Sequence, residues 1–465
     1  ANADGLHRKA KDAGQFEDLL DGSYMSFGLS DSWCRGMTSD MSDDTNEVYY
    51  ALFQNDQGQM LYQYAYNPEL SLKPEKELTV YTLYDQATIN QAATLFGKKH
   101  PDTMVSVHVA CADTDDKEAE TQRNRLMTSL AAGDGEDVIV LSGLDDNALA
   151  KKGVLMDLSD IVTPMEENGE LLQAIVDGEK AADGKQQILP IRFALPLLLS
   201  KEKRASEMTD LAALAKAAEQ TDGSLLGTFT GEDLVETFAP YFMPDIIKDK
   251  QLDTEKLRTV LQELQTIAAH SDLIEKHKKG ERASNEWDLP STMQAALCQI
   301  SGFNDAMFDL AIINLVKGDY TSFENAYIPT VEIGVNANTK QADLAKEFAA
   351  FVMSREVQDG DFYDGFPVNK ESLHMQVNLD RSNYAAYTTI EGADGQEIGL
   401  DIEQIKAADA DKLEALCDSL SKKTVKDAKV LEELEKAVPA YLLGRQSLDD
   451  TISKIQDGVK IYLAE

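Results

Sequence analysis

The apolar residues in the first third of the chain alternate between two spacings. Short apolar runs lie at Leu78–Leu83, Met104–Val109 and Asp137–Leu141, and the stretch Ala87–Lys98 places its apolar residues on one face of a helix. The run Asp137–Leu141 is short and continuous, as expected of a strand that is buried on both faces. The order strand, helix, strand, helix, strand predicts a parallel α/β sheet in this part of the chain.

A second unit of the same kind lies between Tyr327 and Leu373. The apolar run Val331–Val335 precedes Asn338, which is a candidate N-cap for the amphipathic stretch that follows. That stretch ends in charge near Arg355, and a turn rich in Gly and Asp leads into Gly365–Val368. The pattern predicts a strand, a capped helix and a tight turn.

The pattern between residues 200 and 326 predicts mostly helix, together with a strand at Ala295–Ile300. From Ile402 onwards the spacing is helical again. The clearest apolar stripe consists of Leu257, Val260, Leu261 and Leu264.

The N-terminal part has a different character. Glu47–Phe53 and Gln59–Tyr66 are predicted as two strands, joined by a turn at Asn55–Gly58. A lone hairpin is only marginally stable in water, so it must pack on something. Either it is a small all-β appendage or it is the remnant of a larger β domain, and both interpretations stay open. Ser71–Lys76 is a predicted linker.

The charge balance restricts the class of partner. The 465 residues include 82 acidic and 44 basic side chains, for a net charge of −38. Such a field repels phosphate backbones and anionic lipid, which argues against nucleic acid and direct membrane-surface binding. No apolar run is long enough to span a bilayer. Ala1–Gly5 lacks the features of a signal peptide, so a signal has been removed or the sequence has been shortened.

Motifs for catalysis or metal binding are not found in the sequence. Nucleophile-elbow, zinc-protease, P-loop and dinucleotide fingerprints are missing, and Asp113–Glu120 lacks the glycine and spacing of an EF-hand. His270 and His277 lie in a lysine-rich polar stretch, which favours a solvated face over a metal pair. The four cysteines are far apart, and they predict neither a zinc site nor a disulfide framework. We therefore expect a binding protein without enzymatic activity, cofactor or metal.

Several motifs occur in an order that resembles the bacterial extracellular solute-binding proteins of family 1, the maltose-binding-protein-like group. Each motif alone is weak, but their order and spacing from residue 77 to residue 465 are specific. The matching residues are Phe96, Lys98 and Pro101; Ala132, Gly133 and Asp137; Gly153–Leu158; Gly334–Asn336; Leu344–Phe348; and Gly365–Val368.

The resemblance implies an α/β, two-lobed periplasmic-binding-protein-like fold of type II with a small N-terminal β appendage. The appendage would cover residues 1–75. One lobe would comprise residues 76–193 and 334–375, and the other residues 197–328 and 379–465.

It also implies a function. A monomer would close about a hinge on a small solute, a sugar or oligosaccharide, and deliver it to the membrane subunits of an ABC importer. It would lie in the extracellular space or periplasm, anchored as a lipoprotein through a segment absent from this chain. One alternative is a ligand-binding module that feeds a sensor system. A less favoured alternative is an extracellular hydrolase.

In open α/β sheets, ligands bind beyond the carboxyl ends of strands. This rule selects polar and aromatic residues after three of the predicted strands. They are Tyr84 and Asp85; Ser142, Leu144 and Asp145; and Phe303, Asn304 and Asp305.

Further candidates lie near the crossings between the lobes or are isolated aromatic residues. They are Phe193, Tyr241, Trp287, Tyr327, Glu332 and Phe366. In sugar-binding members of the family, an aromatic ring that follows a glycine often stacks on a sugar, and the resemblance gives Phe303 this role. For each aromatic residue, a place in the core stays an open alternative.

Overall fold

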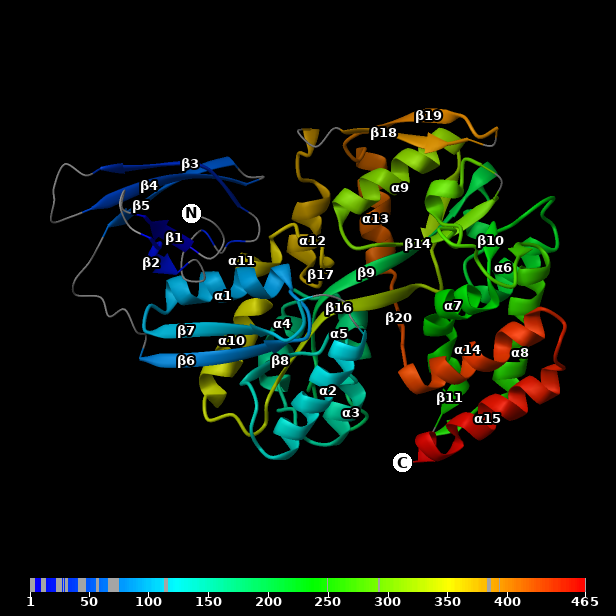
Figure 1. Cartoon of the computed structure of the whole chain (residues 1–465), viewed down its shortest axis with the longest axis horizontal. Helices are drawn as coiled ribbons and strands as arrows, with labels where there is room; N and C mark the ends of the chain where they lie inside the picture. Colours follow the sequence, from blue (N-terminus) through cyan, green and yellow to red (C-terminus); the bar gives the residue numbers. More distant parts are fainter. Residues whose placement is uncertain are drawn as a thin grey trace. The chain divides into compact units, whose positions relative to one another are not determined.

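The computed structural model describes residues 5–9, 14–21, 27, 29, 32–40, 47–55, 58–65, 75–112, 116–248, 250–291, 293–382, 386–392 and 394–464. The chain divides into two compact units (Figure 1). Unit 1 comprises Ala1–Phe193 and Thr330–Gln376, and unit 2 comprises Ala194–Pro329 and Val377–Glu465.

Unit 1 is built on the predicted parallel sheet. Strands β6 (Lys76–Thr82), β7 (Thr103–Val109) and β8 (Val138–Val140) are parallel, with β6 between the other two. The last part of β16 (Ala326–Val335) pairs antiparallel with β8, and β17 (Phe366–Pro367) pairs antiparallel with the first part of β9 (Leu189–Ser200). The α/β prediction is confirmed.

Helices pack around this sheet. The aromatic ring of Phe96 lies 5.3 Å from that of Phe348, so α1 and α10 contact each other. The helices of unit 1 are α1 (Ala87–Lys99), α2 (Asp116–Ala131), α3 (Asp146–Lys151), α4 (Ser159–Glu167), α5 (Gln173–Gly178), α10 (Ala342–Val352), α11 (Arg355–Gln358) and α12 (Lys370–Val377).

The predicted cap of α10 is wrong. The N-cap residue is Gln341 rather than Asn338, and its side chain makes no capping hydrogen bond. Asn336 and Thr339 hold the preceding turn instead, because the Asn336 side chain accepts from the Asn338 backbone N–H at 2.9 Å and Thr339 Oγ1 accepts from that of Gln341 at 3.0 Å.

The N-terminal strands form two small sheets. Strand β1 (Gly5–Arg8) pairs with β2 (Glu17–Asp21), and β3 (Trp33–Asp40), β4 (Val48–Asn55) and β5 (Gly58–Ala65) form a meander. The β4–β5 pair confirms the predicted hairpin, while β3 was not predicted. Leu6, Phe27, Ala51 and Phe53 are the buried residues of a small core here. Residues 66 and 71–74 of the predicted hairpin and linker lie outside the described residues.

In unit 2, the second part of β9 pairs antiparallel with β14 (Ala295–Ile300) and β15 (Asp319–Ser322), and the start of β16 pairs with β20 (Lys422–Lys423). The predicted strand at Ala295–Ile300 is confirmed. The shorter strands are β10 (Thr228–Phe229), β11 (Ile247–Lys248), β12 (Gln251–Leu252), β13 (Asp272–Leu273), β18 (Ala386–Glu391) and β19 (Glu397–Ile402).

A helical core fills unit 2. The predicted stripe Leu257–Leu264 is buried in α8 against α7, α14 and α15. Helix was expected from Ile402, but Ile402 ends β19 and the helix starts at Ala407. The helices are α6 (Leu211–Ala218), α7 (Gly231–Ile246), α8 (Thr254–Ala269), α9 (Phe303–Val316), α13 (Ala407–Asp418), α14 (Ala428–Leu442) and α15 (Leu448–Ala464), with short 3₁₀ turns at η3 (Lys201–Lys203), η4 (Ala205–Glu207) and η5 (Glu286–Asp288).

Among the described helices, none combines the length and apolar character that a membrane crossing requires.

Candidate functional site

The carboxyl ends of β6 and β8 bring two predicted groups together in unit 1. Tyr84 and Leu144 are half-buried and both pack against the cluster that contains Leu83. Gly143, with a φ of 78°, lies so close that a Cβ there would come within 3.1 Å of Leu83 and 3.6 Å of the Tyr84 ring. The turns after β6 and β8 therefore form one surface, as the strand-end rule predicted.

The polar side chains on this surface are fixed by local hydrogen bonds. Ser142 Oγ donates to the Thr330 carbonyl at 2.7 Å, which ties β8 to β16. Asp85 accepts from the Asn90 side chain at 2.8 Å, and Asp145 caps α3 by accepting from the Ala148 N–H at 2.9 Å. Both carboxylates are exposed and keep lone pairs that can accept from a ligand hydroxyl.

Three further carboxylates converge in unit 1. Asp146, Glu179 and Glu332 each offer an oxygen within 4.8 Å of the others, and Glu179 and Glu332 are buried. Of the three, the sequence predicted only Glu332. Within the part of the chain that the structure describes, this group has the donor set that a divalent cation prefers. The same oxygens can accept hydrogen bonds from hydroxyl groups.

A loop from α11 to β17 completes this edge of unit 1. Asp364 accepts from the Thr88 N–H at 2.7 Å and from Thr88 Oγ at 2.8 Å, at the start of α1. Gly365 has a φ of 136°, and a Cβ there would lie 2.3 Å from Thr330 Oγ1. The predicted Gly-Phe-Pro turn needs glycine because the loop closes directly onto β16.

In unit 2, the carboxyl end of β14 leads into α9. Asp305 accepts from the Ser301 N–H at 3.0 Å. Oδ1 of Asn304 is buried, with no hydrogen-bond partner among the described residues. The half-buried Trp287 ring lies 6.1 Å from that of Phe308. Polar and aromatic side chains therefore gather at this strand end as well.

Acidic groups near this strand end have raised pKa values. Burial, followed by the charges of Glu286 and Asp305, raises the pKa of Asp309 well above its ordinary value. Burial also raises the pKa of Glu286, and burial followed by the neighbouring Asp309 raises that of the Cys298 thiol. This part of unit 2 therefore holds carboxyl groups that favour the protonated form.

Most of the predicted aromatic site residues prove to be core residues. Phe303 is only 1% exposed, because it is the first residue of α9 and its ring packs 5.0 Å from the guanidinium of Arg381. An open ring face at Phe303 was therefore a wrong expectation. The other buried residues of this group are Phe193, Tyr241, Tyr327 and Phe366.

The physical reason is that each of these rings has an aromatic or strand partner. Phe193 and Phe366 face each other at 5.8 Å across the β9–β17 pair, and Tyr241 packs edge-on against Phe323 at 5.1 Å. Ligand contact stays a prediction for Tyr84 and Trp287, which are partly exposed.

Sequence reasoning missed three residues that the fold brings to the edge of unit 1. Asp146 directly follows the predicted Asp145, so the strand-end rule could have included it. Tyr363 stands exposed in the Gly- and Asp-rich turn. No local pattern singles out Glu179, because a distant strand brings Glu332 to it.

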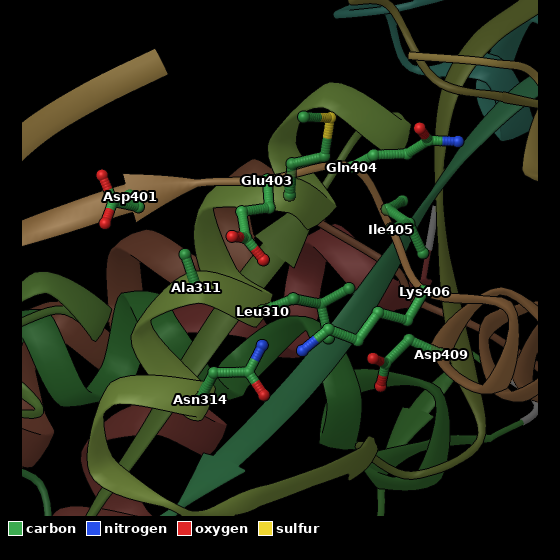
Figure 2. A pocket seen from close by; sticks show the side chains of 10 residues that line it. Leu310, Ala311, Asn314, Asp401, Glu403, Gln404, Ile405, Lys406 and Asp409 are labelled. Atoms are coloured by element: carbon green, nitrogen blue, oxygen red, sulfur yellow. The ribbon is translucent and has the colours of Figure 1, made fainter. Parts of the chain in front are cut away.

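A separate hollow of about 100 Å³ lies in unit 2 between α9 and α13 (Figure 2). Leu310 and Ala311 form its apolar floor, and the side chains of Asn314, Lys406 and Asp409 point into it. Its volume is well below the roughly 300 Å³ at which pockets for drug-sized ligands begin.

Comparison with known proteins gives a consistent result. The family model described as bacterial extracellular solute-binding protein matches residues 82–359, which is more than half of the chain. No curated protein matches the sequence.

Several solved structures share the fold. A sugar-binding protein MalE from Xanthomonas citri is similar, with a TM-score of 0.58 at 14% identity over 83% of this chain and 97% of its own. An ABC substrate-binding protein from Listeria monocytogenes in complex with cycloalternan gives 0.53 at 15% identity, over 84% and 99%. A sugar transporter from Rhizobium etli in an open conformation gives 0.54 at 14% identity, over 83% and 99%.

Proposed function

The chain belongs to the bacterial extracellular solute-binding protein family, and from this premise we propose that it captures a sugar or oligosaccharide for an ABC importer. The family consists of binding proteins and implies a location outside the cell or in the periplasm. Anchoring as a lipoprotein and a monomeric state belong to the same proposal. The observation that carries it is the polar, partly aromatic edge of unit 1 within a chain of this family.

The chemistry of that edge suits a polyhydroxylated ligand. Asp85 and Asp145 are exposed carboxylates, and each is oriented by one local hydrogen bond. Carboxylates held in this way accept hydrogen bonds from hydroxyl groups, and charge-assisted bonds of this kind are roughly twice as strong as neutral ones. The half-buried ring of Tyr84 adds an apolar face for the C–H side of a sugar.

Unit 2 supplies a second set of groups of the same chemistry. Trp287 and Phe308 form an aromatic pair with partly open rings, and Asn304 adds an amide one helical turn before Phe308. Amide and indole N–H groups complement the ether and hydroxyl oxygens of a sugar. We propose that ligand binding shifts the population toward a closed form that the importer recognises.

The solved sugar-binding proteins of this fold support the choice of ligand class. One of them is in complex with cycloalternan, and another is the sugar-binding protein MalE. At 14–15% identity these likenesses establish the fold, and the ligand class comes from the side chains above.

A thermal-shift screen tests the proposal. The panel contains maltotriose, xylotriose and cellotriose, with an amino-acid mixture, a tripeptide and spermidine as the other ligand classes. A ligand present at a hundredfold excess over its dissociation constant stabilises the folded state by about 2.7 kcal/mol. We expect one of the sugars to raise the melting temperature. The proposal would be refuted if only ligands of the other classes raised the melting temperature, or if no ligand did.

A further inference from the structure

An exposed aromatic ring stands out in the loop between α11 and β17. Within the fully described stretch Val357–Asn369, Tyr363 is the only exposed side chain, at 74% exposure. Its neighbour Phe362 is 4% exposed. The fold therefore uses the surrounding residues for packing and leaves this one ring in water.

The loop is held from below by a buried cation. Arg192 on β9 is fully buried, and its Nη2 donates to the carbonyls of Val357 at 3.3 Å and Gly360 at 3.1 Å. Nη1 lies 3.5 Å from the Gly365 carbonyl, and the guanidinium packs 5.1 Å from the ring of Phe362. Arg192 thus contacts loop residues that precede Tyr363 in the sequence, at Val357, Gly360 and Phe362, and one that follows it, Gly365.

A second buried side chain fixes the same backbone. Gln376 Nε2 donates to the carbonyls of Gln358 at 3.0 Å and Gly360 at 2.7 Å. Gln358 accepts in turn from the Val368 N–H at 3.1 Å. These hydrogen bonds hold the backbone on both sides of Tyr363, so little backbone entropy is lost on binding.

The position of the loop places Tyr363 at the candidate site. Asp364, the next residue, is bonded to Thr88, and Thr88 also accepts from Arg192 Nε at 3.1 Å. Thr88 follows Tyr84 and Asp85 by a few residues, at the start of α1. Tyr363 therefore lies on the same edge of unit 1 as the turn after β6.

We propose that Tyr363 is a sugar-stacking residue, which the Arg192 clamp holds ready before the ligand arrives. The proposal rests on the proposed function and names the chemistry of one position in that site: the ring packs against the C–H face of a pyranose. An exposed aromatic ring on a hydrogen-bonded loop, at the edge of unit 1 that also carries Asp85, matches the alternating apolar and hydroxyl surfaces of a sugar.

The test compares three variants by calorimetric titration with maltotriose, xylotriose and cellotriose. Tyr363→Ala removes the ring, Tyr363→Phe keeps it, and Tyr387→Ala is a matched control, because Tyr387 in unit 2 is 68% exposed. For the sugar that binds the wild type, we expect Tyr363→Ala to lose about tenfold in affinity, within the range of aromatic contacts plus burial. Tyr363→Phe and Tyr387→Ala should stay within about twofold of the wild type.

Nitration supplies a second readout that does not depend on a variant. With the bound sugar present, tetranitromethane should modify Tyr363 more slowly, while Tyr387 reacts at its usual rate, as followed by peptide mass spectrometry.

The outcomes separate the two proposals. If a sugar binds and Tyr363→Ala binds it as tightly as the wild type, the stacking role is overturned and the proposed function stands. A variant that melts lower but keeps its affinity per folded molecule also overturns the stacking role. If the wild type binds none of the three sugars, the proposed function is overturned and this inference with it.

Discussion

Replacement of Arg192 by methionine tests whether the buried clamp determines the structure of the site loop. Met has a similar length without charge or donors. The change removes one donor from each of the carbonyls of Val357 and Gly360, which keep the Gly360 N–H and Gln376 Nε2 respectively, and it removes the donor of Thr88 Oγ1. A buried group that loses its partner costs about 1–3 kcal/mol.

The opposing effect is the cost of burying the charge itself. Burial lowers the pKa of Arg192, and the nearby carboxylates, Asp364 first, act in the other direction. Removing the guanidinium relieves this desolvation. Because the lost hydrogen bonds and packing outweigh this relief, we expect a net loss of about 1–3 kcal/mol in the free energy of unfolding of unit 1. Arg192→Lys should show part of the same loss in the free energy of unfolding, because lysine cannot donate to several carbonyls at once.

Hydrogen exchange followed by mass spectrometry is the assay of choice, because a chain of two units need not unfold in a single step. Peptides from 357–369 should exchange faster in Arg192→Met, while α8 in unit 2 should be unchanged. Arg445→Met is the control. Arg445 forms an exposed ion pair with Glu275, and such pairs contribute about 0–1 kcal/mol. If 357–369 keeps its protection in Arg192→Met, the clamp does not hold the loop.

Three further predictions concern other parts of the molecule. Gly365→Ala should destabilise unit 1 by more than Gly153→Ala in urea titrations, because both positions have positive φ but only Gly365 has a neighbour within 4 Å. Burial and the neighbouring carboxylates raise the pKa of Asp309 in the folded state, so the folded chain binds this proton more tightly than the unfolded chain, and stability should fall as pH rises above about 4. Asp309→Asn should flatten that fall in melting curves, and parallel curves for both proteins would contradict the assignment. Deletion of residues 1–70 should leave sugar affinity within a few fold, because the described N-terminal residues have their own small core; lost binding by an otherwise folded protein would give this part a role in the site.

The sequence predicted those features that depend on local spacing. The run that became β8 is continuous and apolar because this strand is buried along its length, and this leaves a signal in any short window. The strand-end rule also selected Tyr84, Ser142 and Asp145, whose turns lie together because parallel strands end at a common edge, and ligand contact by these residues stays a prediction.

The features that depend on distant partners could not be predicted in this way. Whether Phe303 is a platform or a core residue depends on Arg381, which no window around Phe303 contains. Glu179 meets Glu332 only after the fold has formed. Tyr363 was not predicted as a site residue, because Arg192 and Gln376 hold its loop and both are distant in the sequence. An exposed tyrosine in a polar turn also has no distinctive spacing.

The route of the chain through unit 1 also has a consequence for the order of synthesis. The Thr88–Asp364 bonds join residues 276 positions apart, and most of unit 2 is encoded between them. During synthesis, α1 and strands β6 to β8 emerge from the ribosome first. Unit 1 is complete only after β16 and Asp364, which contact them, have also emerged. Contacts of such long range form slowly. The first unit therefore stays incomplete until the chain has been synthesised as far as Asp364.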